Sequence, residues 1–378
     1  MVQSMRCLIS LLLLGSLFAG IASVRAQDDA GYQEALQRID EARQSNATSL
    51  DLKNLDLQAL PPEIATLTHL ESLFLSNNEL TELPLEVIQL GRLERLFLFG
   101  NNLSTLPPEI GQLDQLTWLD VRKNQLQTLP PEIGQLTTLR WLDLSENQLR
   151  DLPSEMAQLA HLFQLDLSRN QFERVPPVLS AMTPLRVLDL SHNHLRDIPP
   201  SLNRLTRLRT LDLQQNQLQT LPPEFGDLAN LELLMLSGNQ LQYLPPQLGH
   251  LSQLRELHLN DNQLTRLPPE LSSLSELQLL NLIRNDLTGL PSEMRQLGKL
   301  QVLRFRGNRL AVPQEVEQRG VQTLLVYVSA SFYERYRAFG AVISAMGVGV
   351  MGLVLLCRLL HWHIGFIPII LLGKISLR

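Results

Sequence analysis

One acidic feature of the sequence recurs with complete regularity. Five aspartates lie 23 residues apart, each in the middle of an L-x-L or L-x-V triplet: Asp120, Asp143, Asp166, Asp189 and Asp212. Carboxylate oxygens are the ligands that calcium and other hard cations prefer, and like charges that lie side by side repel one another. If consecutive units stack, the five side chains form a stripe that either binds cations or serves the structure of the repeat.

A second group of side chains has the composition of a binding surface. Four consecutive 23-residue units supply five aromatic residues: Phe74, Phe97, Phe99, Trp118 and Trp141. They flank leucines that point inward, so strand alternation turns them toward solvent. Aromatic residues gathered on an open face are typical of a hot spot for a partner, although they could also pack on one another across neighbouring strands. We expect Asp120 and Asp143 to belong to the same partner-binding surface.

No group of residues indicates a catalytic centre. The sequence has no nucleophile elbow, phosphate-binding loop, zinc-protease motif or dinucleotide fingerprint. Its histidines are scattered, and Cys7 and Cys357 lie in apolar segments with no cysteine between them, which argues against a disulfide framework or a cysteine-based zinc site. A net charge of -6 gives no general attraction to nucleic acid. We predict no enzymatic activity, no cofactor, no metal site and no nucleic-acid partner.

One repeated pattern must build the elements that carry these residues. The pattern L-x-x-L-x-L-x-x-N-x-L-x-x-L-P returns every 23 residues, and its asparagine occupies eleven positions: Asn78, Asn101, Asn124, Asn147, Asn170, Asn193, Asn216, Asn239, Asn262, Asn285 and Asn308. An atypical first unit begins at Ala47 and has Leu55 in place of the asparagine. A unit of this size cannot bury its own leucines, so the stacked units must share one continuous core.

This pattern, from about Ala47 to Pro313, resembles the leucine-rich repeat family, and its LPPEIGQL stretches are similar to those of Ras-suppressor-like, Scribble-like and bacterial members. The resemblance implies an α/β-type solenoid: a horseshoe with one short parallel strand per repeat on the concave face and a ladder of asparagines. Aspartate within L-x-L is frequent in this family, and Arg140, Arg186 and Arg209 lie beside the stripe. We therefore favour a structural role over cation binding. The proline pairs predict an extended course.

The ends of the solenoid need covers. Apolar residues recur at helical spacing over about 31–44 and predict a helical cap within residues 27–46: Tyr32, Ala35, Leu36, Ile39 and Ala42. The repeats then occupy residues 47–313. Residues 314–337 are predicted to form a C-terminal cap or juxtamembrane helix.

Two apolar segments predict where the protein resides. Residues 1–26 have the features of a signal peptide, with an uncleaved anchor as the alternative. Residues 338–356 carry no charge and would span about 28 Å as a helix, which is close to the hydrocarbon thickness of a bilayer. Ala341, Ala345 and Gly349 form a small-residue face that could pack against another helix. The tail, residues 357–378, would then be cytoplasmic, and residues 359–373 could form a partial second span.

Together these features predict a single-pass membrane protein with its repeats on the extracytoplasmic side, most consistent with a bacterial cell envelope. Its concave face would bind a protein or peptide for recognition or scaffolding. Two other classes remain open. One is an intracellular-type signalling adaptor related to small-GTPase scaffolds, against which the signal peptide argues. The other is a structural envelope or adhesion protein without a discrete ligand.

Overall fold

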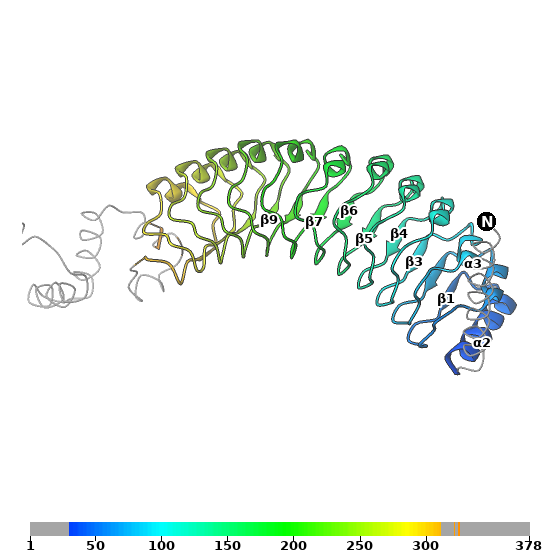
Figure 1. Cartoon of the computed structure of the whole chain (residues 1–378). Coiled ribbons are helices and arrows are strands. Elements are labelled where there is room, and N and C mark those ends of the chain that lie inside the picture. Colours follow the sequence, from blue (N-terminus) through cyan, green and yellow to red (C-terminus); the bar gives the residue numbers. More distant parts are fainter. Residues whose placement is uncertain (1–29, 311–320, 322–323, 326–378) are drawn as a thin grey trace, which may run out of the picture.

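The computed structural model describes residues 30–310, 321, 324 and 325. They form an arch of stacked repeats, with the strands toward its inner side and short helices along its outer edge (Figure 1). Each repeat contributes one strand, and the order of the repeats along the chain is also their order in a 12-stranded parallel sheet. The predicted solenoid with one parallel strand per repeat is therefore confirmed.

The strands are short and lie in register, so that each residue pairs with the one 23 positions away. Their bounds are β1 Ser49–Asp51, β2 Ser72–Phe74, β3 Arg95–Phe97, β4 Trp118–Asp120, β5 Trp141–Asp143, β6 Gln164–Asp166, β7 Val187–Asp189, β8 Thr210–Asp212, β9 Leu233–Met235, β10 Glu256–His258, β11 Leu279–Asn281 and β12 Val302–Arg304. The middle residue of every strand is a buried leucine. The two residues that flank it therefore point to the concave side, because alternate residues of a strand face opposite sides.

Helical turns line the convex side of the arch. Most are 3-10 helices: η1 Pro62–Thr66, η2 Pro108–Gln112, η3 Pro131–Gln135, η4 Ser154–Gln158, η5 Pro177–Ala181, η6 Pro200–Arg204, η7 Pro223–Asp227, η8 Pro246–His250, η9 Pro269–Ser273 and η10 Ser292–Gln296; the α-helix α3, Leu85–Ile88, takes this place in one repeat. Pro107 is extended (φ -67, ψ 147), and Pro108 begins η2. The predicted extended course thus holds for the first proline of a pair. The second starts a helix, where a missing N–H costs nothing.

The repeated asparagines join neighbouring repeats from inside the core. Asn101 Nδ2 donates to the carbonyls of Leu75 at 3.0 Å and Leu98 at 2.9 Å. Its Oδ1 accepts the backbone N–H of Leu80 at 3.1 Å. The other ten make the same kind of bond to the preceding repeat, from Asn78 to Asn308. The amide satisfies backbone groups that would otherwise be buried without partners.

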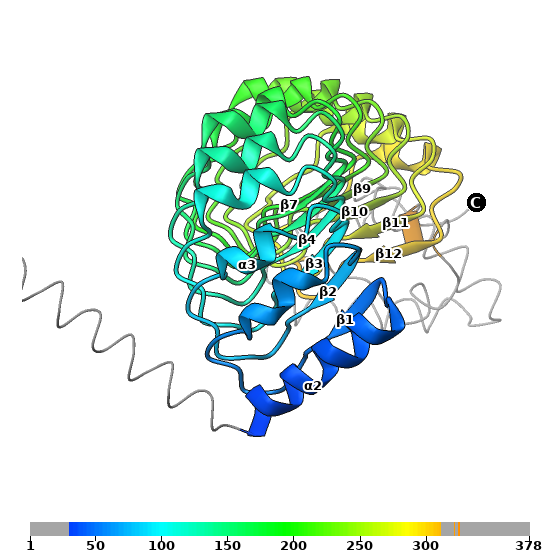
Figure 2. The same ribbon diagram turned by 90° about the vertical axis from the view of Figure 1, so that its right-hand side faces the viewer.

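Helix α2, Ala30–Ser45, covers the N-terminal end of the sheet beside β1 (Figure 2). Its buried side chains are Tyr32, Ala35, Ile39 and Ala42, with Leu36 partly buried against the same core. At the other end, Leu324 and Leu325 are buried in that core, and both are helical. Apolar helical residues therefore contact both open ends of the repeat stack.

Several predicted segments lie outside the described residues. These are the signal peptide at 1–26, the membrane span at 338–356 with Ala341, Ala345 and Gly349, the tail at 357–378 and most of the cap at 314–337. Among the residues that the structure does describe, none of the helices has the length and apolar character needed to cross a bilayer.

Candidate functional site

Four aromatic rings form a continuous row on the concave face, which we call the aromatic ladder: Phe74, Phe97, Trp118 and Trp141, from β2, β3, β4 and β5. Phe74 and Phe97 are stacked, with ring centroids 4.7 Å apart. Phe97 lies 6.2 Å from Trp118 in a tilted arrangement. Trp118 and Trp141 are stacked at 3.9 Å. All four rings are half-buried, so they line the concave face and also pack on one another.

Phe99 is separate from this row. Its ring lies beneath two cations, with the Arg122 guanidinium carbon 4.4 Å and the Lys123 Nζ 5.6 Å from the centroid. It makes no ring–ring contact among the described residues. The structure therefore brings together four of the five predicted aromatic residues. Phe99 instead contacts Arg122 and Lys123 through cation–π interactions.

The carboxylate column, Asp120, Asp143, Asp166, Asp189 and Asp212, runs through β4 to β8 in register. Strand alternation alone would turn these side chains toward solvent, but Asp120, Asp143 and Asp212 are only 5%, 3% and 6% exposed. The reason is local: the Oδ1 atom of each aspartate accepts the backbone N–H two residues later, at 2.8 to 3.2 Å. This bond folds the side chain back over the end of its own strand.

Burial, the first cause in each case, raises the pKa of Asp120, Asp143, Asp189 and Asp212. Burial raises the pKa of Asp143 to about 6, and the charges of Asp166 and Asp120 add to the effect while the Ser145 hydroxyl opposes it. Burial, reinforced by Asp189, raises the pKa of Asp212 to about 7. Keeping Asp143 and Asp212 in their charged forms therefore costs free energy in the folded protein. In the described part of the chain, no three acidic, histidine or cysteine side chains converge on a point that could hold a metal ion.

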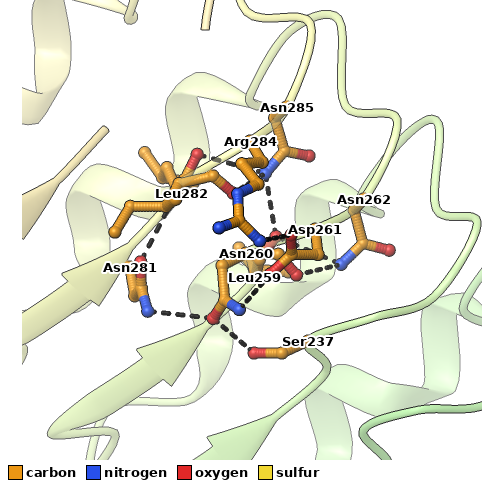
Figure 3. Close-up of polar contacts among 10 residues, drawn as sticks. Ser237, Leu259, Asn260, Asp261, Asn262, Asn281, Leu282, Arg284 and Asn285 are labelled. Atoms are coloured by element: carbon orange, nitrogen blue, oxygen red, sulfur yellow. Dashed lines mark hydrogen bonds and ion pairs between the residues drawn. The ribbon is translucent and has the colours of Figure 1, made fainter. Parts of the chain in front are cut away.

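Beyond the end of the column at β8, a polar network lies between β9 and β11 (Figure 3). Asn281 occupies the strand position of the aspartates, and its Oδ1 likewise accepts the backbone N–H two residues later, at 3.3 Å. Its Nδ2 donates to Asn260 Oδ1 at 2.9 Å. The Ser237 hydroxyl donates to the same oxygen at 2.6 Å. These amide groups already bond to one another, which makes them poor candidates for a ligand site.

Two residues near the ladder, Lys53 and Phe163, do not belong to the predicted site, and one predicted residue, Trp118, has a polar group that the sequence did not predict to be buried. Lys53 places its Nζ 5.2 Å from the centroid of Phe74, at the first ring of the row. Phe163 is 38% exposed just before β6, next to the repeat that supplies Trp141. The indole N–H of Trp118 is buried and has no acceptor within the described residues. A comparison of the residues that immediately precede each strand would have identified Phe163 from the sequence. The other two features depend on side-chain packing.

Two family models for the leucine-rich repeat match this chain. One covers residues 114–172, 182–247 and 252–310, and the other covers residues 69–90 and 92–113. With the sheet, the helical turns and the asparagine ladder described above, these matches identify the chain as a member of the leucine-rich repeat family. A search of curated proteins found no significant match.

Solved structures of the same fold come from bacteria and plants. A leucine-rich-repeat protein of Leptospira interrogans is 36% identical, with a TM-score of 0.56 over 71% of this chain and 80% of that one. The ectodomain of the Arabidopsis receptor kinase HAESA, solved with a peptide hormone, is 31% identical, with a TM-score of 0.58 over 69% and 46%. The functional domain of InlJ from Listeria monocytogenes is 25% identical, with a TM-score of 0.61 over 72% and 56%. The chain thus spans about half the length of the HAESA and InlJ structures.

Proposed function

We propose that this protein is a non-enzymatic recognition module that binds a protein or peptide on its concave face, with the aromatic ladder as the anchor. The observation that carries the proposal is the row of four half-buried rings on consecutive strands. Large aromatic side chains gain the most from excluding water at an interface, and interface hot spots are enriched in tryptophan.

The fold itself does not require these rings. Ser49, Ser72 and Thr210 occupy the strand position of Trp118 and Trp141 in other repeats. The ladder also leaves a buried indole N–H without an acceptor at Trp118, which costs free energy in the unbound protein. Side chains that the repeat does not need, and that carry such a cost, support a role in binding.

The related structures favour the same kind of ligand. The HAESA ectodomain was solved with a peptide hormone, and the ectodomain of another Arabidopsis receptor kinase, GASSHO1/SCHENGEN3, was solved with Casparian strip integrity factor 2. These ligands belong to those proteins. For the present chain they support a protein or peptide as the ligand class.

We further propose that the repeats lie outside the cytoplasm and are tethered through residues 338–356, with residues 1–26 as the export signal. Protease accessibility in intact cells and in spheroplasts tests this arrangement. Digestion of the repeats in spheroplasts is expected. Protection of the repeats until the cytoplasmic membrane is broken would support an intracellular adaptor instead.

Pull-down from envelope extracts tests the binding surface. The wild-type chain is compared with Phe97→Ser/Trp118→Ser, in which serine at position 118 matches the native choice at Ser49 and Ser72. Tyr243→Ser is the matched control, because Tyr243 is 51% exposed and lies away from the concave face, between β9 and η8. We expect a saturable partner that the double variant loses and the control retains. A partner retained by both variants would remove the ladder from the binding site, and no saturable partner would favour a structural spacer.

A further inference from the structure

Four carboxylates of the column have no ion-pair partner. Asp120 pairs with Arg122 at 3.5 Å. Asp143, Asp166, Asp189 and Asp212 make no ion pair within 4.0 Å in the described part of the chain. Neighbouring strands are about 4.8 Å apart, so these four side chains repel one another along β5 to β8. The middle of the concave face therefore holds four carboxylates without ion pairs, of which Asp166 and Asp189 are the more accessible to a ligand.

The repeat does not need this charge. The bond that each aspartate makes is to a backbone N–H, and the neutral amide of Asn281 makes the same bond in β11. Met235 in β9 occupies the same strand position and has no carboxylate at all. An amide would thus serve the strand as well as a carboxylate, without the repulsion.

Three arginines that precede the strands of the column form no ion pair with it. Arg140, Arg186 and Arg209 lie three residues before Asp143, Asp189 and Asp212 respectively, which corresponds to about 10 Å along a strand. All three arginine side chains are exposed to water, which screens charges at that separation. Arg209 is also engaged with Glu232 at 3.4 Å. Arg169 favours the charged form of Asp189 at longer range, but among the described residues no arginine or lysine forms an ion pair with Asp143, Asp166, Asp189 or Asp212.

The charged and aromatic surfaces are continuous. Trp141, the last ring of the ladder, and Asp143, the first unpaired carboxylate, lie on the same strand, β5. From this arrangement, and resting on the function proposed above, we propose that the concave face docks an extended polypeptide segment with an aromatic or aliphatic anchor followed by basic residues. The anchor packs on the ladder, and lysine or arginine side chains lie over the column from β5 to β8.

The dimensions set the length of the segment. The ladder and the unpaired carboxylates each cover four strands, or about 14 Å at the spacing of a sheet. An extended chain advances about 3.3 to 3.6 Å per residue. Each half of the surface therefore accommodates about four residues, and the whole segment has about eight to ten residues.

Selection from a phage-displayed library of random peptides of about twelve residues, on the immobilised full-length chain, tests this proposal. Phe97→Ser alters the ladder, and Asp166→Asn/Asp189→Asn removes two charges while keeping the oxygen that accepts the backbone bond. Glu224→Gln/Glu270→Gln is the matched control, because it removes two exposed carboxylates from the convex helices η7 and η9. Circular dichroism of each variant confirms that the repeats are folded.

We expect the wild-type chain and the control to enrich peptides with an apolar residue and a basic cluster. The asparagine variant should keep the apolar preference, lose the basic one and bind the selected basic peptides about tenfold more weakly. Enrichment of neutral or acidic peptides, dependent on Phe97 but unchanged in the asparagine variant, would overturn this proposal and leave the proposed function standing. If no enriched peptide responds to Phe97→Ser, peptide recognition by the ladder fails as well.

Discussion

The asparagine ladder makes a quantitative prediction about stability. Asn170 Nδ2 donates to the carbonyls of Leu144 and Leu167 at 2.9 and 3.1 Å. Asn147 and Asn193 also donate to these two carbonyls, so both keep a partner when Asn170 is replaced by alanine. The N–H of Leu149 bonds to Asn170 Oδ1 at 2.9 Å. Asn170→Ala leaves it buried and unpaired.

The loss of stability in Asn170→Ala can be estimated from these hydrogen bonds. An orphaned buried N–H costs about 2 kcal/mol, and each of the two lost donor bonds costs about 0.5 to 1 kcal/mol, for a total of about 3 kcal/mol. Asn308 is half-buried at the end of the ladder, where water replaces part of each lost bond. We expect Asn308→Ala to cost about 1 kcal/mol.

Equilibrium urea denaturation, followed by far-ultraviolet circular dichroism, measures these differences. The matched control is Asn102→Ala, because Asn102 is exposed and its amide oxygen only accepts a surface bond from Gln125 at 3.3 Å. That variant should stay within about 0.5 kcal/mol of the wild type. An Asn170→Ala loss no larger than that of the control, or equal losses at Asn170 and Asn308, would refute this account of the ladder.

Three further predictions concern the rest of the solenoid. Burial raises the pKa of Asp212 from 3.8 to about 7, so the folded state binds the proton more tightly than the unfolded state. The free energy of unfolding, measured with urea, should therefore fall as pH rises from about 4 to about 7. This fall should be less steep in Asp212→Asn. Gly134→Ala should cost about 1 to 3 kcal/mol in the same assay, because its Cβ would collide with the Glu155 carbonyl; an unchanged midpoint would contradict the packing of η3 on η4. The stacked indoles of Trp118 and Trp141 should give an exciton couplet in circular dichroism that Trp141→Phe abolishes, and its persistence would show that the rings are not stacked.

The solenoid could be predicted from the sequence because its determinants are local and repeated. A leucine at each inward position, an asparagine every 23 residues and a proline before each convex turn leave only one way to stack the units. The same period places Phe74 beside Phe97, Trp118 beside Trp141 and Asp143 beside Asp166, since residues one repeat apart become neighbours in register.

The state of the concave side chains could not be predicted in this way. Asp143 appears exposed from strand alternation, but its carboxylate turns back to the N–H and hydroxyl of Ser145, and this bond buries it. Phe99 occurs near the other aromatic residues, yet Arg122 covers its ring. Rotamers of this kind depend on contacts between several side chains at once, which a repeat period does not encode.

Site-specific photo-crosslinking on the concave face tests the central claim most directly. A photoreactive phenylalanine derivative replaces Phe97 in one variant and Gln112 in another; Gln112 belongs to the same repeat and is exposed on the convex helix η2. Irradiation in intact cells, followed by mass spectrometry of the adducts, identifies what touches each face. The account predicts a discrete protein or peptide adduct at Phe97 and none at Gln112. Equal adducts at both positions, or an adduct at Gln112 alone, would contradict recognition through the concave face.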